Sequence, residues 1–276
     1  MGKSLVERKI DELNLSWYNS YYWKYQYNLS KEYIVPYLRI IGFEPRGKFI
    51  CEVGSAEGGV LCAFAEQNAQ YCLATDIVES RLNAGRQIAS ALDLPIEFRC
   101  HNIISDELPE HWKDGFDLIL LRDVIEHLEK PEVALLKLKD MLKDGGLLYV
   151  TFPPYYSPFG GHQHQVQNFF SKIPYLHWLP TPLFTKLIKN GRPADVHEVL
   201  RLKTIRLTIR KFLNLVEKVG FEILESEFFL VRPVYKYKFG LKTMKLPGKA
   251  TMLYLKEVIA TEASFVLVKR RLNGTK

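Results

Sequence analysis

Cysteine is scarce in this chain, and long apolar runs are absent. The cysteines are Cys51, Cys62, Cys72 and Cys100. Their spacing suits neither a zinc site nor a disulfide framework, and their neighbours are apolar, so we expect reduced, buried thiols. No apolar run is long enough to span a bilayer. The polar, aromatic N-terminus lacks the pattern of a signal peptide, so we expect a cytoplasmic protein.

Internal repeats and low-complexity segments are also absent, and the composition is that of a globular protein. Hydrophobic residues make up 47% of the chain, and 276 residues suffice for one large α/β domain with an insertion. The formal net charge of +7 leaves two interpretations open. It favours an anionic partner, such as a phosphorylated sugar, RNA or a membrane surface, or it is only a solvated surface.

The stretch 49–61 organises the chain. An apolar run, Phe49–Val53, precedes a turn of small residues and then an apolar helical pattern, which predicts a buried strand, a tight turn and a helix start. The small residues are Gly54, Ala56, Gly58 and Gly59. Such a turn lets a ligand approach the backbone, and the helix N-terminus offers N–H groups to an anion. A purely structural turn would show the same pattern.

Strand and helix patterns alternate after this turn. The predicted strands are Phe49–Val53, Tyr71–Thr75, Ile96–Cys100, Phe116–Leu121, Leu147–Phe152, Phe221–Leu230 and Glu262–Lys269. The predicted helices between them cover about Gly58–Asn68, Ser80–Leu92, Pro131–Leu142 and Thr204–Val219. Alternation of this kind predicts a doubly wound α/β fold, with a mostly parallel seven-stranded sheet and helices on both faces.

Three segments lie outside the alternating pattern. Residues 1–46 are helical and rich in aromatic residues, which predicts a cap packed on the sheet domain, a lid over a ligand, or both. The domain itself, residues 47–276, contains an irregular insertion at about 153–200, of the kind that often carries function. It contains a second insertion at about 232–260, with lysines at Lys236, Lys238, Lys242, Lys245 and Lys249.

Asp76 ends the second predicted strand, 22 residues after Gly54. A carboxylate at this place can accept hydrogen bonds from both ribose hydroxyls of an adenosine-containing cofactor, whether NAD or S-adenosylmethionine. It could also cap the following helix or lie in a solvated loop.

These motifs, taken in order, resemble the class I S-adenosylmethionine-dependent methyltransferases, which have a Rossmann-like sheet. The resemblance is closest to the group with a Glu-His pair after the fourth strand, and it covers about residues 45–152. The matching segments are Phe49–Gly59, Ala74–Asp76, Phe116–Ile119, Val124–Leu128 and Leu142–Val150. The departures are Ala56, where the group often has glycine, and Asp144, where proline is common.

The resemblance implies S-adenosylmethionine as the cofactor, S-adenosylhomocysteine as its product, and a set of binding residues. The residues implied are Glu52, Gly54, Ser55, Ala56, Gly58, Asp76, Ile77, Asn102 and Arg122. The turn and Glu52 would lie at the methionine moiety, and Arg122 near the methyl group, unless it is a surface or ion-paired arginine. Asp76 would hold the ribose, with Ile77 against the adenine face and Asn102 at the adenine edge.

Asp123, Glu126 and His127 follow the fourth predicted strand, and three interpretations compete. Glu126 and His127 could cap a helix and pack the loop. His127 could accept a proton from a substrate hydroxyl. The three residues could also hold a divalent metal, as in quinone O-methyltransferases with a similar string. We expect no metal, because residues so close in sequence need not converge.

His162 and His164 lie in a glycine-containing loop of the first insertion. One of them could bind or deprotonate the acceptor, or both could only order the loop. The phrase Gly160–Gln163, followed by Pro174–His177, resembles methyltransferases linked to surface polysaccharides or natural products.

We therefore expect O-methylation of a small hydroxylated acceptor, a sugar or natural product, with His127, His162 or His164 as the base. We expect no DNA partner. The alternatives are a non-catalytic cofactor-binding scaffold, an RNA methyltransferase and an NAD-dependent oxidoreductase. Membrane contact through Lys236–Lys249 and the oligomeric state stay open.

Overall fold

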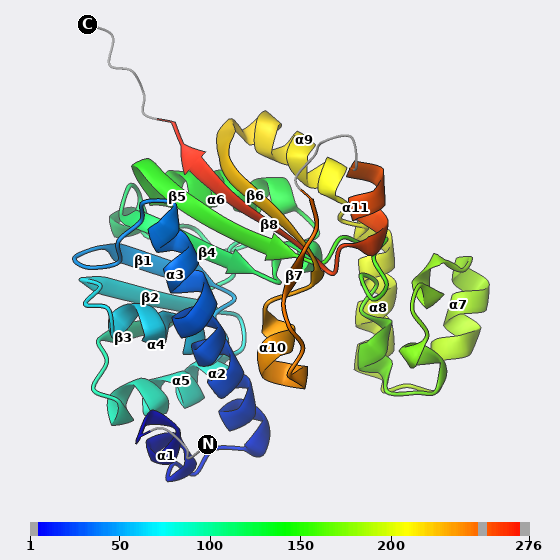
Figure 1. Cartoon of the computed structure of the whole chain (residues 1–276), viewed down its shortest axis with the longest axis horizontal. Helices are drawn as coiled ribbons and strands as arrows, with labels where there is room; N and C mark the ends of the chain where they lie inside the picture. The colour runs from blue at the N-terminus through cyan, green and yellow to red at the C-terminus, as the bar shows by residue number, and fades with distance from the viewer. Residues whose placement is uncertain (1–4, 248–252, 271–276) are drawn as a thin grey trace, which may run out of the picture.

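The computed structural model describes residues 5–247 and 253–270, which form one mixed sheet flanked by helices (Figure 1). The strand order is β3-β2-β1-β4-β5-β8-β6-β7. The strands are β1 (Phe49–Val53), β2 (Tyr71–Asp76), β3 (Ile96–Cys100), β4 (Phe116–Arg122), β5 (Leu142–Phe152), β6 (Phe221–Val231), β7 (Met244–Lys245) and β8 (Glu262–Lys269). Strands β1 to β5 pair in parallel, and β8 is antiparallel to both β5 and β6. The carboxyl ends of β1, β2 and β4 therefore share one edge.

The doubly wound, mostly parallel α/β fold is confirmed, but the sheet has an eighth strand that the sequence did not predict. This strand, β7, has two residues and pairs with Phe229 and Val231 at the edge of β6. Two residues are too few to show an alternating pattern. Strand β5 begins at Leu142, five residues before the predicted start at Leu147, and its register with β4 shifts between Phe116 and Leu118.

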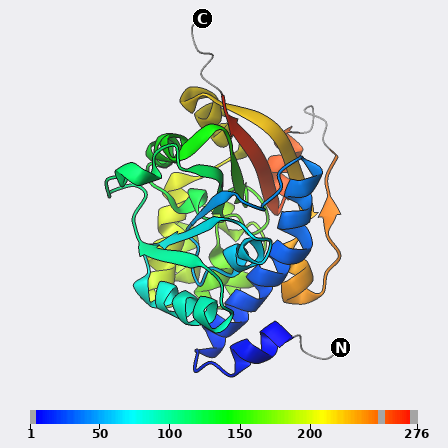
Figure 2. The same ribbon diagram turned by 90° about the vertical axis from the view of Figure 1, so that its left-hand side faces the viewer.

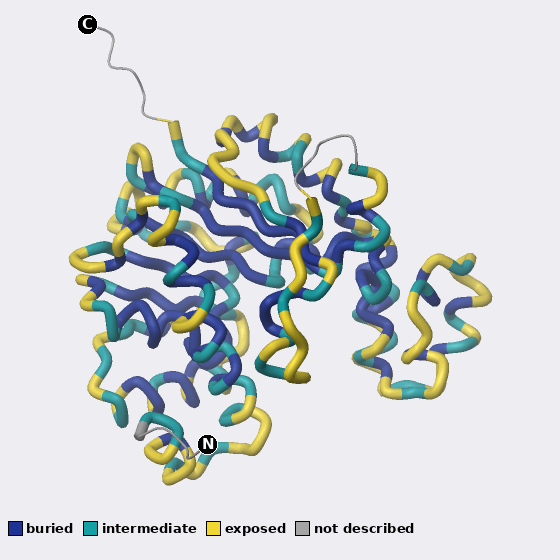
Figure 3. Tube along the Cα trace, viewed as in Figure 1, coloured by how far each residue is buried: buried dark blue, intermediate teal, exposed yellow. Residues whose placement is uncertain are grey.

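Helices cover both faces of the sheet, as predicted. The helices are α4 (Gly59–Ala65), α5 (Glu79–Ala91), α6 (Pro131–Met141) and α9 (Ile209–Val219), with short 3-10 turns at Glu110–Trp112 and Ile125–His127. Within β4, Ile119 and Leu121 pack with α6 and α9, whereas Leu118 and Leu120 pack with α4 and α5. The central strands are thus buried on both sides (Figure 3).

The N-terminal segment forms one short helix and then, after a loop, a long helical run beside α4 (Figure 2). It comprises α1 (Leu5–Asp11), α2 (Trp17–Leu29), a π-helical turn (Ser30–Ile34) and α3 (Val35–Ile40). Trp23 and Tyr27 of α2 are buried. A Cβ on Gly59 would lie 2.7 Å from the Trp23 carbonyl oxygen, so glycine permits this close approach. The π-helical turn precedes Pro36, which has no N–H to donate.

The first insertion contains more regular structure than the sequence indicated. It contains 3-10 turns at Gln163–Val166, Phe170–Lys172 and Leu176–Trp178, then α7 (Thr181–Ile188) and α8 (Pro193–Ile205). It has a small core of its own, made by Val166, Leu176, Phe184, Ile188 and Val199. The predicted helix Thr204–Val219 is divided, because α8 ends at Ile205 and α9 begins at Ile209.

The second insertion contains α10 (Val234–Phe239), β7 and α11 (Leu253–Ile259), while Lys249 lies outside the described residues. Cys51, Cys62 and Cys72 are buried free thiols as expected, but Cys100 at the end of β3 is exposed. Among the described residues, every helix is too short or too polar to cross a membrane.

Candidate active site

The turn after β1 requires glycine at two positions. Gly54 has φ +74°, and a Cβ there would lie only 2.3 Å from Cγ2 of Val124. Gly58 has φ +71°, and a Cβ there would lie 2.8 Å from the Phe98 ring. The Gly54 N–H donates to the Thr75 carbonyl at 2.8 Å, which ties the turn to β2. The turn therefore holds its backbone close to the end of β4.

Asp76, at the end of β2, braces this turn. Its carboxylate accepts hydrogen bonds from the N–H of Ala56 at 2.8 Å and the N–H of Val78 at 2.9 Å. Ala56 is buried and has φ +53°, so alanine occupies a left-handed position that glycine would adopt without strain. Each carboxylate oxygen has a further lone pair. Asp76 can therefore still accept hydrogen bonds from a ribose.

Glu52 and Arg122 place buried ionisable groups next to the turn, on the neighbouring strands β1 and β4. Arg122 donates to Oε1 of Gln26 on α2 at 2.8 Å. Within the described residues, Nε of Arg122, Oε2 of Glu52 and Oγ of Ser55 are buried without a hydrogen-bond partner. Burial, opposed by Arg122, raises the pKa of Glu52 to about 8. The Arg122 guanidinium fits the carboxylate of an amino-acid moiety, and the Glu52 carboxyl group fits its ammonium, whose positive charge would favour the ionised form of Glu52.

Ile77 and Asn102 lie at the ends of β2 and β3. Ile77 is 67% exposed, so its apolar side chain is open to a planar ligand. The side-chain oxygen of Asn102 accepts hydrogen bonds from the N–H groups of Ile104 at 2.9 Å and Ser105 at 3.3 Å. Because this oxygen closes the turn, Asn102 offers a ligand mainly its amide N–H groups.

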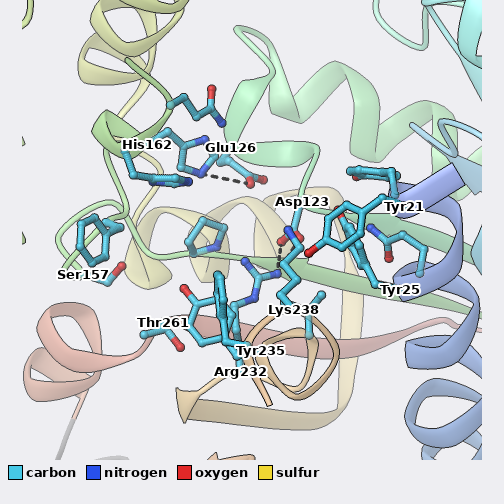
Figure 4. A pocket seen from close by; sticks show the side chains of 18 of the residues that line it. Tyr21, Tyr25, Asp123, Glu126, Ser157, His162, Arg232, Tyr235, Lys238 and Thr261 are labelled. Carbon is cyan, nitrogen blue, oxygen red and sulfur yellow. Dashed lines mark hydrogen bonds and ion pairs between the residues drawn. The ribbon is translucent and has the colours of Figure 1, made fainter. Parts of the chain in front are cut away.

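A cavity of about 760 Å³ lies next to these groups (Figure 4). Its wall is formed by the tyrosines of α2, by the first insertion, by α10 and by the residues that follow β4. His127, His162 and His164 all line it, whereas the predicted cofactor residues are not among its lining residues. Gln26, which binds Arg122, and Asp123, which follows Arg122, connect the two regions.

Helix α2 has two roles at this site. Trp23 and Tyr27 are buried among residues of α4 and α5, so this side of the helix packs as a cap. Its other tyrosines line the cavity and are Tyr18, Tyr21, Tyr22 and Tyr25. The structure therefore contains both the packing that the aromatic N-terminus predicted and a tyrosine wall at the cavity.

Glu126, His127 and His162 form a tight cluster in the cavity wall. One nitrogen or oxygen atom from each lies within 4.8 Å of those of the others. Oε1 of Glu126 is 3.8 Å from Nε2 of His127 and 3.9 Å from Nε2 of His162. Both carboxylate oxygens are buried and have no hydrogen-bond partner in the described part of the chain. Burial raises the pKa of Glu126 to about 8.

Helix α8 of the insertion fixes the orientation of His127. Nδ1 of His127 lies 2.7 Å from Oε1 of Glu198, and Arg201 binds both Glu198 oxygens at 2.8 Å. Burial alone would lower the pKa of His127, but the hydrogen bond to Glu198 and the negative charges of Glu126 and Glu198 together outweigh it and raise the pKa. The same bond lowers the pKa of Glu198 to about 2. The carboxylate favours the proton on Nδ1, which leaves Nε2 facing Glu126 and His162.

His162 and His164 differ from His127 in their environment. Burial, reinforced by the positive potential of His127, lowers the pKa of His162 well below its usual value. Burial also lowers the pKa of His164. The His162 ring centroid lies 4.9 Å from that of His127 and 5.9 Å from that of His164. His162 is therefore a neutral imidazole near pH 7, in contact with His127.

The segments Gly160–Gln163 and Pro174–His177 of the first insertion contact each other. A Cβ on Gly161 would lie 2.4 Å from the His177 ring, so glycine is needed where the phrases cross. Nε2 of His177 donates to the Tyr155 carbonyl at 2.7 Å. Burial lowers the pKa of His177 to about 4. His177 thus supports the loop that presents His162.

Asp123 does not join Glu126 and His127, contrary to one interpretation of the sequence. Its carboxylate pairs with Arg232 at 2.5 Å, and Arg232 also pairs with Glu262 at 2.6 Å. His162 takes the third place in the cluster instead. Because Arg232 is far away in the sequence, the local string 123–127 could not reveal this pairing.

Sequence reasoning did not single out Glu198, Arg232 or Tyr235 as site residues. It noted Lys238 only for its charge. Lys238 lines the cavity, and its Nζ lies 4.3 Å from the centre of the Tyr25 ring. Burial lowers the pKa of Lys238 to about 8. The dense tyrosines of residues 17–37 were the available signal for this wall of the cavity.

Comparison with known proteins identifies the domain. Residues 51–148 match the family described as "Methyltransferase domain". A ubiquinone biosynthesis O-methyltransferase from Coxiella burnetii is 24% identical over 106 residues, which are 38% of this chain and 44% of that protein. The match thus spans less than half of the curated relative.

Solved structures extend the likeness over most of the chain. An S-adenosylmethionine-dependent methyltransferase from Mesorhizobium loti has a TM-score of 0.54 and 18% identity, covering 84% of this chain and 96% of that chain. The [4+2]-cyclase SpnF has a TM-score of 0.52 and 14% identity, covering 87% and 82%. At such identities the likeness shows the fold alone. Residues 51–148 therefore match a methyltransferase domain, and the chain around them shares the fold of these methyltransferase structures.

Proposed function

We propose that this protein transfers the methyl group of S-adenosylmethionine to a hydroxyl oxygen of a small acceptor bound in the 760 Å³ cavity. The Glu126–His127–His162 cluster is the observation that carries the proposal. Methyl transfer from a sulfonium is a direct displacement, in which the protein mainly aligns the reacting atoms and excludes water. A hydroxyl acceptor must also lose a proton, and the cluster offers groups that can accept it.

The cofactor would lie along the ends of β1, β2 and β4. Glu52 and Arg122 would bind the ammonium and carboxylate of its methionine moiety, because both leave buried polar atoms without partners. Asp76 would accept hydrogen bonds from the ribose, with Ile77 against the adenine and Asn102 donating to its edge. The backbone at Gly54, Ser55, Ala56 and Gly58 would line the methionine moiety.

His127 is the best candidate for the general base. Glu198 holds its Nδ1 proton, so Nε2 has a free lone pair in the neutral form of the ring, which is populated above the raised pKa. His162 would accept a hydrogen bond from the acceptor or position it, because it is neutral and lies against His127. His164 lines the cavity farther along and would contact the acceptor. The tyrosines of α2 offer flat surfaces for a sugar or an aromatic natural product.

A second version of this function places a divalent metal ion in the cluster. One carboxylate and two imidazoles form a ligand set that suits such an ion, and Glu198 orients His127 as carboxylates often orient metal-bound histidines. The residues that would hold it are Glu126, His127 and His162. When bound, the ion would act as a Lewis acid and lower the pKa of the acceptor hydroxyl. Chelation would then abolish turnover, and added metal would restore it.

The match to a methyltransferase family favours S-adenosylmethionine over NAD. It leaves an RNA acceptor, a non-catalytic scaffold and the cytoplasmic location as matters for experiment. Salt-sensitive binding of RNA, with methylated RNA as product, would replace the small acceptor by RNA.

The test is an acceptor screen with S-adenosylmethionine carrying a tritiated methyl group. We expect label in hydroxylated acceptors and not in their O-methylated analogues. His127→Ala should lower the single-turnover rate at least about 100-fold, in line with the loss of a general base, without weakening S-adenosylhomocysteine binding. His197→Ala is the matched control, because His197 is an exposed histidine of α8. Labelling of amines alone, or a normal rate for His127→Ala, would refute the proposed mechanism.

A further inference from the structure

The first insertion displays a group of exposed apolar side chains. They belong to residues 167–192, here called the α7 hairpin, which projects from the body of the molecule (Figures 1 and 3). Phe169 is 80% exposed and Trp178 is 49% exposed. The other exposed apolar residues of the hairpin are Phe170, Ile173 and Leu183. Exposed apolar side chains that gather on one projecting segment mark a contact with a partner or a membrane.

Packing within the insertion keeps these residues at the surface. Phe184 and Ile188 of α7 are fully buried in the small core of the insertion. Leu183 and Lys186 lie on the same helix and are exposed. The buried side of α7 is therefore apolar, whereas its exposed side combines apolar and basic residues.

The charge around the hairpin has one sign only. Residues 145–194 contain no aspartate and no glutamate, but they contain Lys172, Lys186, Lys189 and Arg192. The three lysines are exposed, and within residues 5–247 and 253–270 none of them forms an ion pair, whereas Arg192 pairs with Asp195. The apolar patch is therefore surrounded by uncompensated positive charge.

The second insertion, which has more lysines, lacks this property. Lys236 is paired with Glu32, and Lys245 is paired with Glu227. Lys238 faces the cavity. Of the lysines noted above in the described part of this insertion, only Lys242 is exposed and forms no ion pair with a described residue. The positive potential that the sequence suggested there is thus largely neutralised.

We propose that the α7 hairpin binds the surface of a bilayer that contains anionic lipids. Aromatic and aliphatic side chains would enter the interfacial layer, where tryptophan is favoured, while Lys172, Lys186 and Lys189 contact lipid phosphates. An acidic protein surface would match the charge, but five exposed apolar side chains beside lysines fit an interface that is both apolar and anionic. The contact is interfacial, because no described helix can cross the bilayer.

The test measures sedimentation of the intact protein with sucrose-loaded vesicles. We expect binding to vesicles of phosphatidylcholine and phosphatidylglycerol, weaker binding to phosphatidylcholine alone, and release by high salt. Phe169→Ser combined with Leu183→Ser should lower the partition coefficient at least about tenfold, since each removes buried apolar contact with the bilayer. Lys172→Glu combined with Lys189→Glu should do the same on anionic vesicles.

Two variants serve as matched controls. Ile40→Ser removes an 83% exposed apolar residue from α3, and Lys242→Glu reverses an exposed lysine of the second insertion. Both should bind vesicles like the wild type. Every variant should bind S-adenosylhomocysteine with unchanged affinity, which verifies folding and separates this inference from the proposed function.

Four results would overturn the inference. The wild type could fail to bind anionic vesicles. The hairpin variants could bind as tightly as the wild type, or only Lys242→Glu could lose binding. Finally, sedimentation velocity without lipid could show self-association that Phe169→Ser and Leu183→Ser abolish, which would assign the patch to a second copy of the chain.

Discussion

Replacing Glu198 by glutamine should lower the pKa of His127. Glu198 accepts a hydrogen bond from Nδ1 of His127 at 2.7 Å, and burial alone would lower the pKa. A hydrogen bond between charged groups contributes about 1.5–3 kcal/mol and a neutral one about 0.5–1.5 kcal/mol. The difference, about 1–1.5 kcal/mol, is the stabilisation of the protonated imidazole that the variant should lose. Glutamine keeps the size and the hydrogen bond but removes the charge.

The assay is a titration of the histidine ring by NMR, with chelator present, in the wild type and Glu198→Gln. The matched control is Glu129→Gln, because Glu129 is an exposed carboxylate 3.9 Å from Arg201. The raised pKa of His127 also predicts how the stability of the fold depends on pH. Protonated His127 stabilises the fold below the pKa that His127 has in the unfolded chain, and this contribution disappears as pH rises through its pKa in the folded protein. An unchanged or higher pKa of His127 in Glu198→Gln would show that Glu198 does not control this imidazole.

Two further changes test the turn and the buried carboxyl. Gly54→Ala should abolish S-adenosylhomocysteine binding and destabilise the fold by about 1–3 kcal/mol, because its Cβ would lie 2.3 Å from Val124. Thermal melts should show that adding Val124→Ala partly restores the stability. If it does not, this clash is not the cause of the destabilisation. The raised pKa of Glu126, about 8, means that wild-type stability falls as pH rises from the unfolded value through 8, so Glu126→Gln should flatten this dependence in urea titrations. Parallel curves for the two proteins would contradict the assignment of a buried, protonated Glu126.

The sheet and the cofactor turn could be predicted because their signals are local. Strands β1 and β3 and the last strand, β8, have the predicted bounds, since apolar runs next to turn residues are visible over a few positions. The short β7 was missed because its pairing depends on β6 rather than on its own residues. Helix α8 was missed because residues 153–200 are rich in proline and aromatic residues, which favoured an irregular segment.

The candidate site also combines residues that the sequence indicated with contacts that it did not. His127 and His162 were both singled out, but only the folded chain brings their rings to 4.9 Å. Asp123 was grouped with its sequence neighbours, whereas in the structure it forms an ion pair with the buried Arg232. Glu198 had no signal, because a glutamate on a helix is most often solvated. The parts of the site that depend on charge pairs between residues far apart in the chain therefore could not be predicted from the sequence.

The most direct test of the central claim is calorimetric titration of S-adenosylhomocysteine into the wild type and Asp76→Ala. Asp76 braces the turn at Ala56 and is the predicted ribose ligand, so its loss should weaken binding at least about tenfold. Ser105→Ala, in the exposed turn after β3, is the control and should bind like the wild type. Saturable binding that weakens only in Asp76→Ala is the predicted result. A well-folded wild type that does not bind the cofactor product would contradict the account.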